Sequence, residues 1–174
     1  MSGSADRAVP DTAREKKAMA YPVRKILRDS RTVAMVGLSA RPEQDSYRVA
    51  RYLIDHGYEV IPINPSADQI LGRKSYASLR DLPQPPDVVD VFRRAEFAPE
   101  IVEDAIAAKA KAVWLQLGLV HRDAARRARE AGLLVVMDRC MKREHECMTG
   151  AAPAQAESAP PAATCQWRPQ APQK

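Results

Sequence analysis

A short segment near the carboxyl-terminal end carries side chains that could perform nucleophilic chemistry. Asp138, Arg139 and Cys140 follow an apolar run, and Glu144 and His145 come shortly after. A nucleophilic cysteine needs a base within hydrogen-bond reach, and this spacing permits His145 to act on Cys140 without placing it there. Catalysis by Cys140 and His145 is therefore one hypothesis. The simpler interpretation is a small buried thiol beside an Asp138–Arg139 ion pair.

The cysteines give no sign of a metal site or a disulfide framework. Cys140, His145 and Cys147 have a C-x4-H-x-C spacing that matches no common zinc pattern, so we expect no metal. Cys165 makes the set odd, and no C-x-x-C pair is present. This usage fits a reducing compartment and predicts a cytoplasmic protein.

A second group of polar residues follows the first apolar run, 32–36. The turn contains Gly37, Leu38, Ser39, Ala40 and Arg41 and leads toward a helix, whose free N–H groups favour an anion. Of the three glycines of the dinucleotide pattern G-x-G-x-x-G, only Gly37 is present. An NAD(P)-binding oxidoreductase or redox sensor is therefore an alternative that this turn does not favour.

Polar tips also follow the other apolar runs, which cover 59–63, 88–91, 112–115 and 133–137. The acidic residue that would hold an NAD ribose should fall at the second tip, but that tip reads Asn-Pro-Ser. The tip residues considered as ligand contacts are Asn64 and Pro65, then Phe92, Arg93 and Arg94, then Gln116 and Gly118.

The elements that must position these tips are strands and helices in alternation. Helices are expected over 22–29, from a cap at Ser46 to Gly57, over 97–106 and over 122–131. Strands that are apolar on both faces and separated by helices specify a covered parallel sheet. The prediction is an α/β fold: a single Rossmann-like, doubly wound, mostly parallel sheet of about five strands with helices on both faces. Ligands of such sheets bind beyond the carboxyl ends of the strands.

The chain of 174 residues divides into a core and two tails. We expect a flexible segment over 1–20, one domain over 21–148, and a disordered tail rich in Ala, Pro and Gln over 149–174. No apolar run approaches the roughly 18 to 20 residues that cross a bilayer, so no membrane partner is expected.

The formal charge of +5 and pI near 9.3 favour an anionic partner without identifying it. Four arginines between 122 and 129 most simply form a solvated helix face, and they lack the interleaved aromatic residues that nucleic-acid binding would favour.

Several of these motifs, in this order, resemble those of a known family. They are Val36–Pro42, Ser46–Leu53, Pro62–Pro65, Asp87–Arg93, Val113–Gln116 and Asp138–Cys140 with Glu144 and His145. The resemblance is to the small stand-alone CoA-binding proteins, whose Rossmann-like fold is similar to the amino-terminal CoA-binding domain of the succinyl-CoA synthetase alpha subunit. It covers about residues 21–148.

The resemblance implies coenzyme A or acyl-CoA as the ligand. It places the diphosphate at Gly37–Arg41 and Ser46, the adenosine beside Asn64 and Pro65, and Phe92, Arg93 and Arg94 on the opposite side. The phosphohistidine loop of the synthetase belongs to a second domain that does not occur in this sequence, so no ligase activity is expected and no reaction is assigned. An enzyme acting on CoA thioesters through Cys140 remains an alternative, and a homodimer or an unidentified protein partner is left open.

Overall fold

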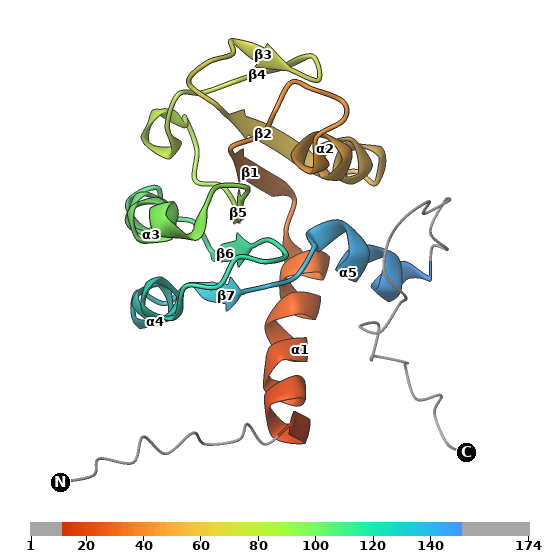
Figure 1. The fold of residues 1–174 in the computed structure, drawn as a ribbon, viewed down its shortest axis with the longest axis vertical. Helices are drawn as coiled ribbons and strands as arrows, with labels where there is room; N and C mark the ends of the chain where they lie inside the picture. Colours follow the sequence, from red (N-terminus) through yellow and green to blue (C-terminus); the bar gives the residue numbers. More distant parts are fainter. Residues whose placement is uncertain (1–11, 151–174) are drawn as a thin grey trace, which may run out of the picture.

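The computed structural model describes residues 12–150, and its centre is a parallel five-stranded sheet in the order β2-β1-β5-β6-β7 (Figure 1). This confirms the predicted fold class. The runs that form the sheet were all anticipated, and only the last strand is shorter than its run. The strands are β1 (Thr32–Val36), β2 (Glu59–Ile63), β5 (Val88–Val91), β6 (Ala112–Leu115) and β7 (Leu134–Val136).

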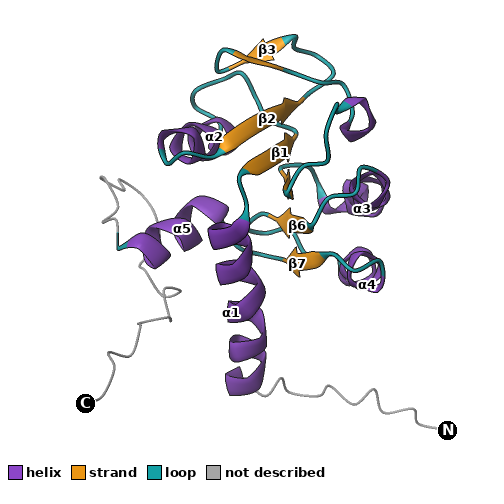
Figure 2. Cartoon of the chain, turned by 180° about the vertical axis from the view of Figure 1, so that it is seen from behind, coloured by secondary structure: helices purple, strands orange, loops and turns teal. Residues whose placement is uncertain are grey.

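Helices cover both faces of this sheet. In Figures 1 and 2, α3 and α4 lie on one side, and α1, α2 and α5 lie on the other. The helices are α1 (Thr12–Asp29), α2 (Asp45–Asp55), α3 (Ala98–Ala107), α4 (Arg122–Glu130) and α5 (Met141–Thr149), with 3₁₀ turns η1 (Leu79–Asp81) and η2 (Ala95–Phe97).

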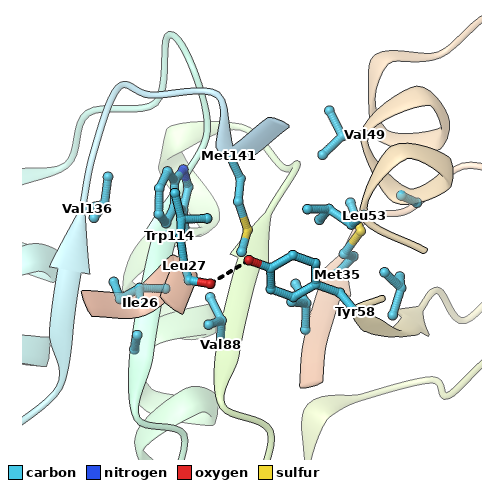
Figure 3. Close-up of a cluster of buried hydrophobic side chains, with 14 of the residues drawn as sticks. Ile26, Leu27, Met35, Val49, Leu53, Tyr58, Val88, Trp114, Val136 and Met141 are labelled. Atoms are coloured by element: carbon cyan, nitrogen blue, oxygen red, sulfur yellow. Dashed lines mark hydrogen bonds between the residues drawn. The ribbon is translucent and has the colours of Figure 1, made fainter. Parts of the chain in front are cut away.

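The larger side chains fill the face covered by α1, α2 and α5. Trp114 of β6 is fully buried there with Met141 from the start of α5 (Figure 3). Tyr58 donates a hydrogen bond of 2.6 Å from its hydroxyl to the backbone carbonyl of Leu27, drawn as the dashed line. Because the tyrosine lies just before β2 and Leu27 lies in α1, this bond fixes the end of α1 against the sheet.

Small residues fill much of the opposite face. Ala124, Ala125 and Ala128 of α4 are buried, as is Ala105 of α3. Such short side chains allow these two helices to pack close to the strands. Both faces of β5 and β6 are therefore covered, which is why their runs contain no exposed residue.

Three local features differ from the sequence-based expectations. Helix α1 starts at Thr12, ten residues before the helix that was expected over 22–29; the alanine, lysine and glutamate content of residues 12–20 favours helix. Helix α5 was not anticipated. The residue that caps α2 is Gln44, two positions before the expected Ser46, whose hydroxyl is used elsewhere.

The stretch between β2 and β5 is largely irregular, as expected. It contains a small hairpin of β3 (Gln69–Ile70) and β4 (Arg73–Lys74), and an isolated parallel bridge joins Tyr76 to Ile63 at the end of β2. This bridge places the segment that follows the hairpin beside the carboxyl end of β2.

No helix in the part of the chain that the structure describes is long and apolar enough to cross a membrane. The predicted tail, with Cys165, lies outside the described residues from position 151 onward.

Candidate functional site

The order in which the chain adds strands to the sheet reverses between β1 and β5. Chain order runs from β1 outward to β2 on one side, then returns to β5 on the other side of β1. Val36 pairs with Ile63 and with Val91, so the three strand ends lie level with one another. In open α/β sheets a ligand crevice forms at such a reversal.

Gly37 is the point of closest contact between the β1 and β5 tips. Its φ is +85°, a left-handed conformation that side chains rarely adopt, and a Cβ there would lie 2.7 Å from the Phe92 carbonyl oxygen. The same Cβ would meet Cδ of Arg93 at 2.8 Å. Only glycine fits this position, and its small size lets Arg93 lie directly over the turn.

The turn after Gly37 is fixed by two serine hydroxyls. The Ser39 backbone N–H donates to Oγ of the buried Ser46 at 3.1 Å, and the Arg41 N–H donates to Oγ of Ser39 at 3.1 Å. Ser46 lies in the first turn of α2, so its hydroxyl attaches the turn to the helix start. The Ser39 hydroxyl keeps its own hydrogen for a further acceptor, such as an anionic oxygen.

Asn64 holds the β2 tip against the β1 tip. Its side-chain amide donates to the carbonyl oxygen of Leu38 at 2.9 Å, and its side-chain oxygen accepts the Ser66 N–H at 2.8 Å. The Leu38 side chain itself is fully buried, so only its backbone is at the tip.

A cavity of about 350 Å³ opens beside these tips. Five of the predicted contacts line it: Gly37, Ser39, Asn64, Pro65 and Arg93. The opposite wall comes from the segment after the hairpin and from the start of α3, and none of its residues was among the predicted contacts. That wall includes Ser78, Leu79, Phe97, Glu100 and Ile101.

The charged groups around the cavity have both signs. The Arg93 guanidinium lies over the Phe97 ring, 5.1 Å from its centroid. This cation–π contact holds the arginine side chain along the cavity wall. Asp104 also lines the cavity but is paired with Arg80 at 2.7 Å. Arg93 is therefore the cation that the cavity offers to an anionic ligand.

Other predicted contacts lie outside this cavity. Ala40 and Arg41 are exposed in the turn, and Arg94 points to Glu96, with 3.7 Å between their charged atoms. Phe92 is partly buried and packs against the hydrophobic cluster on the face covered by α1, α2 and α5. These residues lie at the carboxyl edge of the sheet but do not line the cavity.

Gln116, at the β6 tip, is held by a buried acid that sequence reasoning overlooked. Its side-chain nitrogen donates to both carboxylate oxygens of Asp90, at 2.8 and 2.9 Å. Asp90 is fully buried within β5, and burial raises its pKa to about 7. The signal was present in the sequence, because an acid in an otherwise apolar strand requires a partner.

The β6 and β7 tips are joined by further hydrogen bonds. The Gly118 N–H donates to the Asp138 carboxylate at 2.8 Å, and Nε1 of Trp114 donates to the Arg139 carbonyl at 2.7 Å. Arg139 pairs with Glu144 at 2.7 Å, rather than with Asp138 as the simpler interpretation assumed. These bonds fix the start of α5 at the carboxyl edge.

Cys140 and His145 do not form a nucleophile–base pair. Burial raises the pKa of the Cys140 thiol, the opposite of what nucleophilic activation requires. Nδ1 of His145 lies 3.0 Å from the Tyr52 hydroxyl, and the His145 ring packs edge-on against Tyr58. Among the described residues no three side chains of His, Cys, Asp or Glu could together hold a metal.

His145 gives the fold a pH dependence. Burial and the neighbouring His56 lower its pKa below the ordinary 6.5, so below that pH the unfolded chain takes up its proton first. This contribution to stability is complete above about pH 6.5 and is lost as the pH falls toward the folded-state pKa, by at most about 1.4 kcal/mol per pH unit.

Urea denaturation of the wild type and His145→Gln at several pH values between 7 and 5 measures this contribution. We expect the wild type to lose stability relative to the variant as the pH falls. Asp90 has the opposite slope, because its raised pKa makes the folded state retain a proton that the unfolded chain releases. For that reason the quantity to compare is the difference in the free energy of unfolding between the wild type and His145→Gln. A difference that stays constant between pH 7 and 5 would contradict the lowered pKa of His145.

Comparison with known proteins identifies the family to which this site belongs. Residues 31–146 match the family model of the CoA-binding domain, a range that includes every strand tip described above. The chain belongs to the CoA-binding domain family. It is 42% identical over 123 residues to the uncharacterized protein YneT of Bacillus subtilis (strain 168), covering 71% of this chain and 91% of YneT.

The chain is also similar to one segment of a larger protein that is named as an enzyme. The alpha subunit of an ADP-forming acetate–CoA ligase from Pyrococcus furiosus is 32% identical over 80 residues, which is 42% of this chain but 17% of that subunit. A solved structure of a hypothetical protein from Pyrococcus horikoshii OT3 has a TM-score of 0.72 and 45% identity, covering 75% of this chain and 92% of that one. The resemblance noted in the sequence is therefore confirmed at the level of the family.

Proposed function

We propose that this protein binds coenzyme A or an acyl-CoA across the β1, β2 and β5 tips. The observation that carries the proposal is the cavity at the reversal of strand order, inside the region that matches the CoA-binding family model. The Gly37 turn and the start of α2 offer hydrogen-bond donors and a helix amino terminus to the diphosphate. Asn64 and Pro65 flank the adenosine, and Arg93 supplies the positive charge.

No reaction is proposed. The stretch of similarity to the acetate–CoA ligase covers 17% of that subunit. Within the described residues, Cys140 has no base in hydrogen-bond contact and its thiol pKa is raised. Binding of the ligand, rather than chemistry on it, is the activity that the arrangement of residues supports.

Calorimetric titration with CoA, acetyl-CoA, NAD and NADP at one fixed salt concentration tests the ligand class. We expect micromolar binding of the CoA species and none of the nicotinamide nucleotides. The β1 turn and the β2 tip both disfavour NAD, since two pattern glycines and the acidic ribose ligand are missing. Binding of NAD or NADP alone would overturn the proposal in favour of the oxidoreductase alternative.

Arg93→Ala tests where the ligand lies. Loss of one charge-assisted phosphate contact should weaken CoA binding by about 1–3 kcal/mol, or roughly 5- to 150-fold. The matched control is Arg126→Ala on α4, an exposed arginine that pairs with Asp123 and Glu130 away from the carboxyl edge. Equal affinities in the two variants would show that the ligand does not reach Arg93.

A further inference from the structure

The Asp90–Gln116 pair has a geometry that determines which way the glutamine amide faces. Both carboxylate oxygens of Asp90 lie within 2.9 Å of the same amide nitrogen of Gln116. An ionised carboxylate only accepts hydrogen bonds, so the nitrogen must face Asp90 and the amide oxygen must face away. Asp90 itself is completely buried, and Gln116 is 5% exposed.

The Gln116 amide oxygen is left without a partner. It accepts no hydrogen bond from any described residue, and no fully buried side-chain oxygen or nitrogen in the described part of the chain lacks one. This oxygen must therefore reach the solvent. An amide that is otherwise buried, with its nitrogen fixed and its oxygen open at the end of β6, is an acceptor directed at a ligand.

The position of Gln116 matches one part of the proposed ligand, so this step rests on the proposed function. Adjacent strands lie about 4.8 Å apart, which puts the β6 tip roughly 10 Å from the β1 tip, where the diphosphate would lie. The pantetheine arm of CoA has about the length of four extended residues, roughly 14 Å. Its two amide N–H groups are donors within that reach.

We infer that Asp90 is a positioning residue, which orients the Gln116 amide so that its oxygen accepts a hydrogen bond from an amide N–H of the pantetheine arm. This adds recognition of the arm to recognition of the nucleotide. It also explains why a carboxyl group is retained in the interior of β5, where an apolar side chain would pack at lower cost.

The groups around Asp90 allow the pair to be examined with the acid ionised. Burial raises its pKa to about 7, and the hydrogen bonds from the Gln116 side chain and the backbone N–H of Val91 oppose that shift. The thiol of Cys140, the residue just before α5, interacts electrostatically with Asp90. Burial raises the pKa of this thiol, and the positive charge of Arg143 opposes that rise. At pH 8, above that pKa, the ionised form of Asp90 predominates, while the raised pKa keeps the Cys140 thiol protonated.

The experiment compares CoA with adenosine 3′,5′-bisphosphate, which carries the nucleotide part but no pantetheine arm. In the wild type at pH 8, CoA should bind more tightly. In Asp90→Asn the new side-chain amide can pair with the Gln116 amide in either of its two orientations. The Gln116 oxygen is then no longer fixed toward the ligand. We expect CoA affinity to fall about three- to tenfold, the loss of one neutral hydrogen bond, while the affinity of the bisphosphate changes less than about twofold.

Gln116→Met provides a second variant, because methionine has a similar length and no amide oxygen. It should lower the affinity for CoA relative to that for the bisphosphate, as Asp90→Asn does. The double variant should lower this ratio no further. Equal weakening of both ligands in these variants would indicate a general structural role and overturn the inference. Equal affinity of the wild type for CoA and the bisphosphate would also overturn it, yet leave the proposed function intact. If the wild type binds neither ligand, the proposed function fails and the inference fails with it.

Discussion

Gly37→Ala should lower the free energy of unfolding by about 2–5 kcal/mol and abolish measurable CoA binding. The left-handed backbone costs an L-residue roughly 1–2 kcal/mol, and a methyl group forced into a packed contact adds about 1–3 kcal/mol. The contact is severe, because the neighbour at 2.7 Å is the backbone oxygen of Phe92 and cannot rotate away. Relief requires the β1 and β5 tips to separate, which also displaces Arg93.

Gly132→Ala is the matched control for this substitution. Its φ of +89° is nearly the same, but nothing lies within 4 Å of the position that a Cβ would take. Gly132→Ala should lose only the stability that the left-handed backbone costs an L-residue, and it should keep full affinity for CoA. Urea denaturation and calorimetry on both variants separate the two effects, and equal losses of stability would show that the tips are not in contact.

Trp114→Ala should cost about 3–5 kcal/mol, the usual range for removing a large buried aromatic side chain. Trp114 is fully buried and lies among side chains of α1, β7 and α5 (Figure 3). Its indole N–H also satisfies the Arg139 carbonyl at 2.7 Å, so the substitution removes a donor and a packing surface together.

Trp114→Phe distinguishes the two contributions. It keeps an aromatic ring and loses the donor, so we expect a smaller loss of about 1–3 kcal/mol from the unpaired Arg139 carbonyl. Urea denaturation of both variants measures these losses. If phenylalanine costs as little as 0.5 kcal/mol, water replaces the indole donor and the bond does not hold the β7–α5 connection.

The strands and their tips could be predicted because each depends on a local pattern. Each of the five mainly apolar runs formed a strand, since a covered parallel sheet buries both faces of such a run. Helix α5 could not be predicted in the same way. Its sequence has no continuous apolar stripe, and its buried residues Met141 and His145 are satisfied by Trp114, Tyr52 and Tyr58, which are distant in the sequence.

In the candidate site, too, the residues set by a local pattern could be predicted and those set by distant contacts could not. Gly37, Asn64 and Arg93 were identified because each directly follows a strand or lies next to the residue that does. The wall formed by Ser78, Phe97 and Ile101 was not, because it depends on how the irregular stretch after β2 folds back toward α3. Asp90 was passed over as part of a strand, and its meaning appears only with Gln116 beside it.

The reversal of strand order also has a consequence for how the protein acquires its site. Asp87, just before β5, accepts hydrogen bonds from the backbone N–H groups of Arg31 and Thr32, and the first of these contacts spans 56 positions of sequence. Such distant pairings form slowly, since the intervening chain must first be closed into a loop. The first βαβ unit contains the Gly37 turn but lacks Arg93, so a partly folded chain has only half of the crevice. A ligand that requires both halves of the crevice would bind the completed fold alone. It would stabilise the whole domain by mass action, to an extent set by its concentration relative to its Kd.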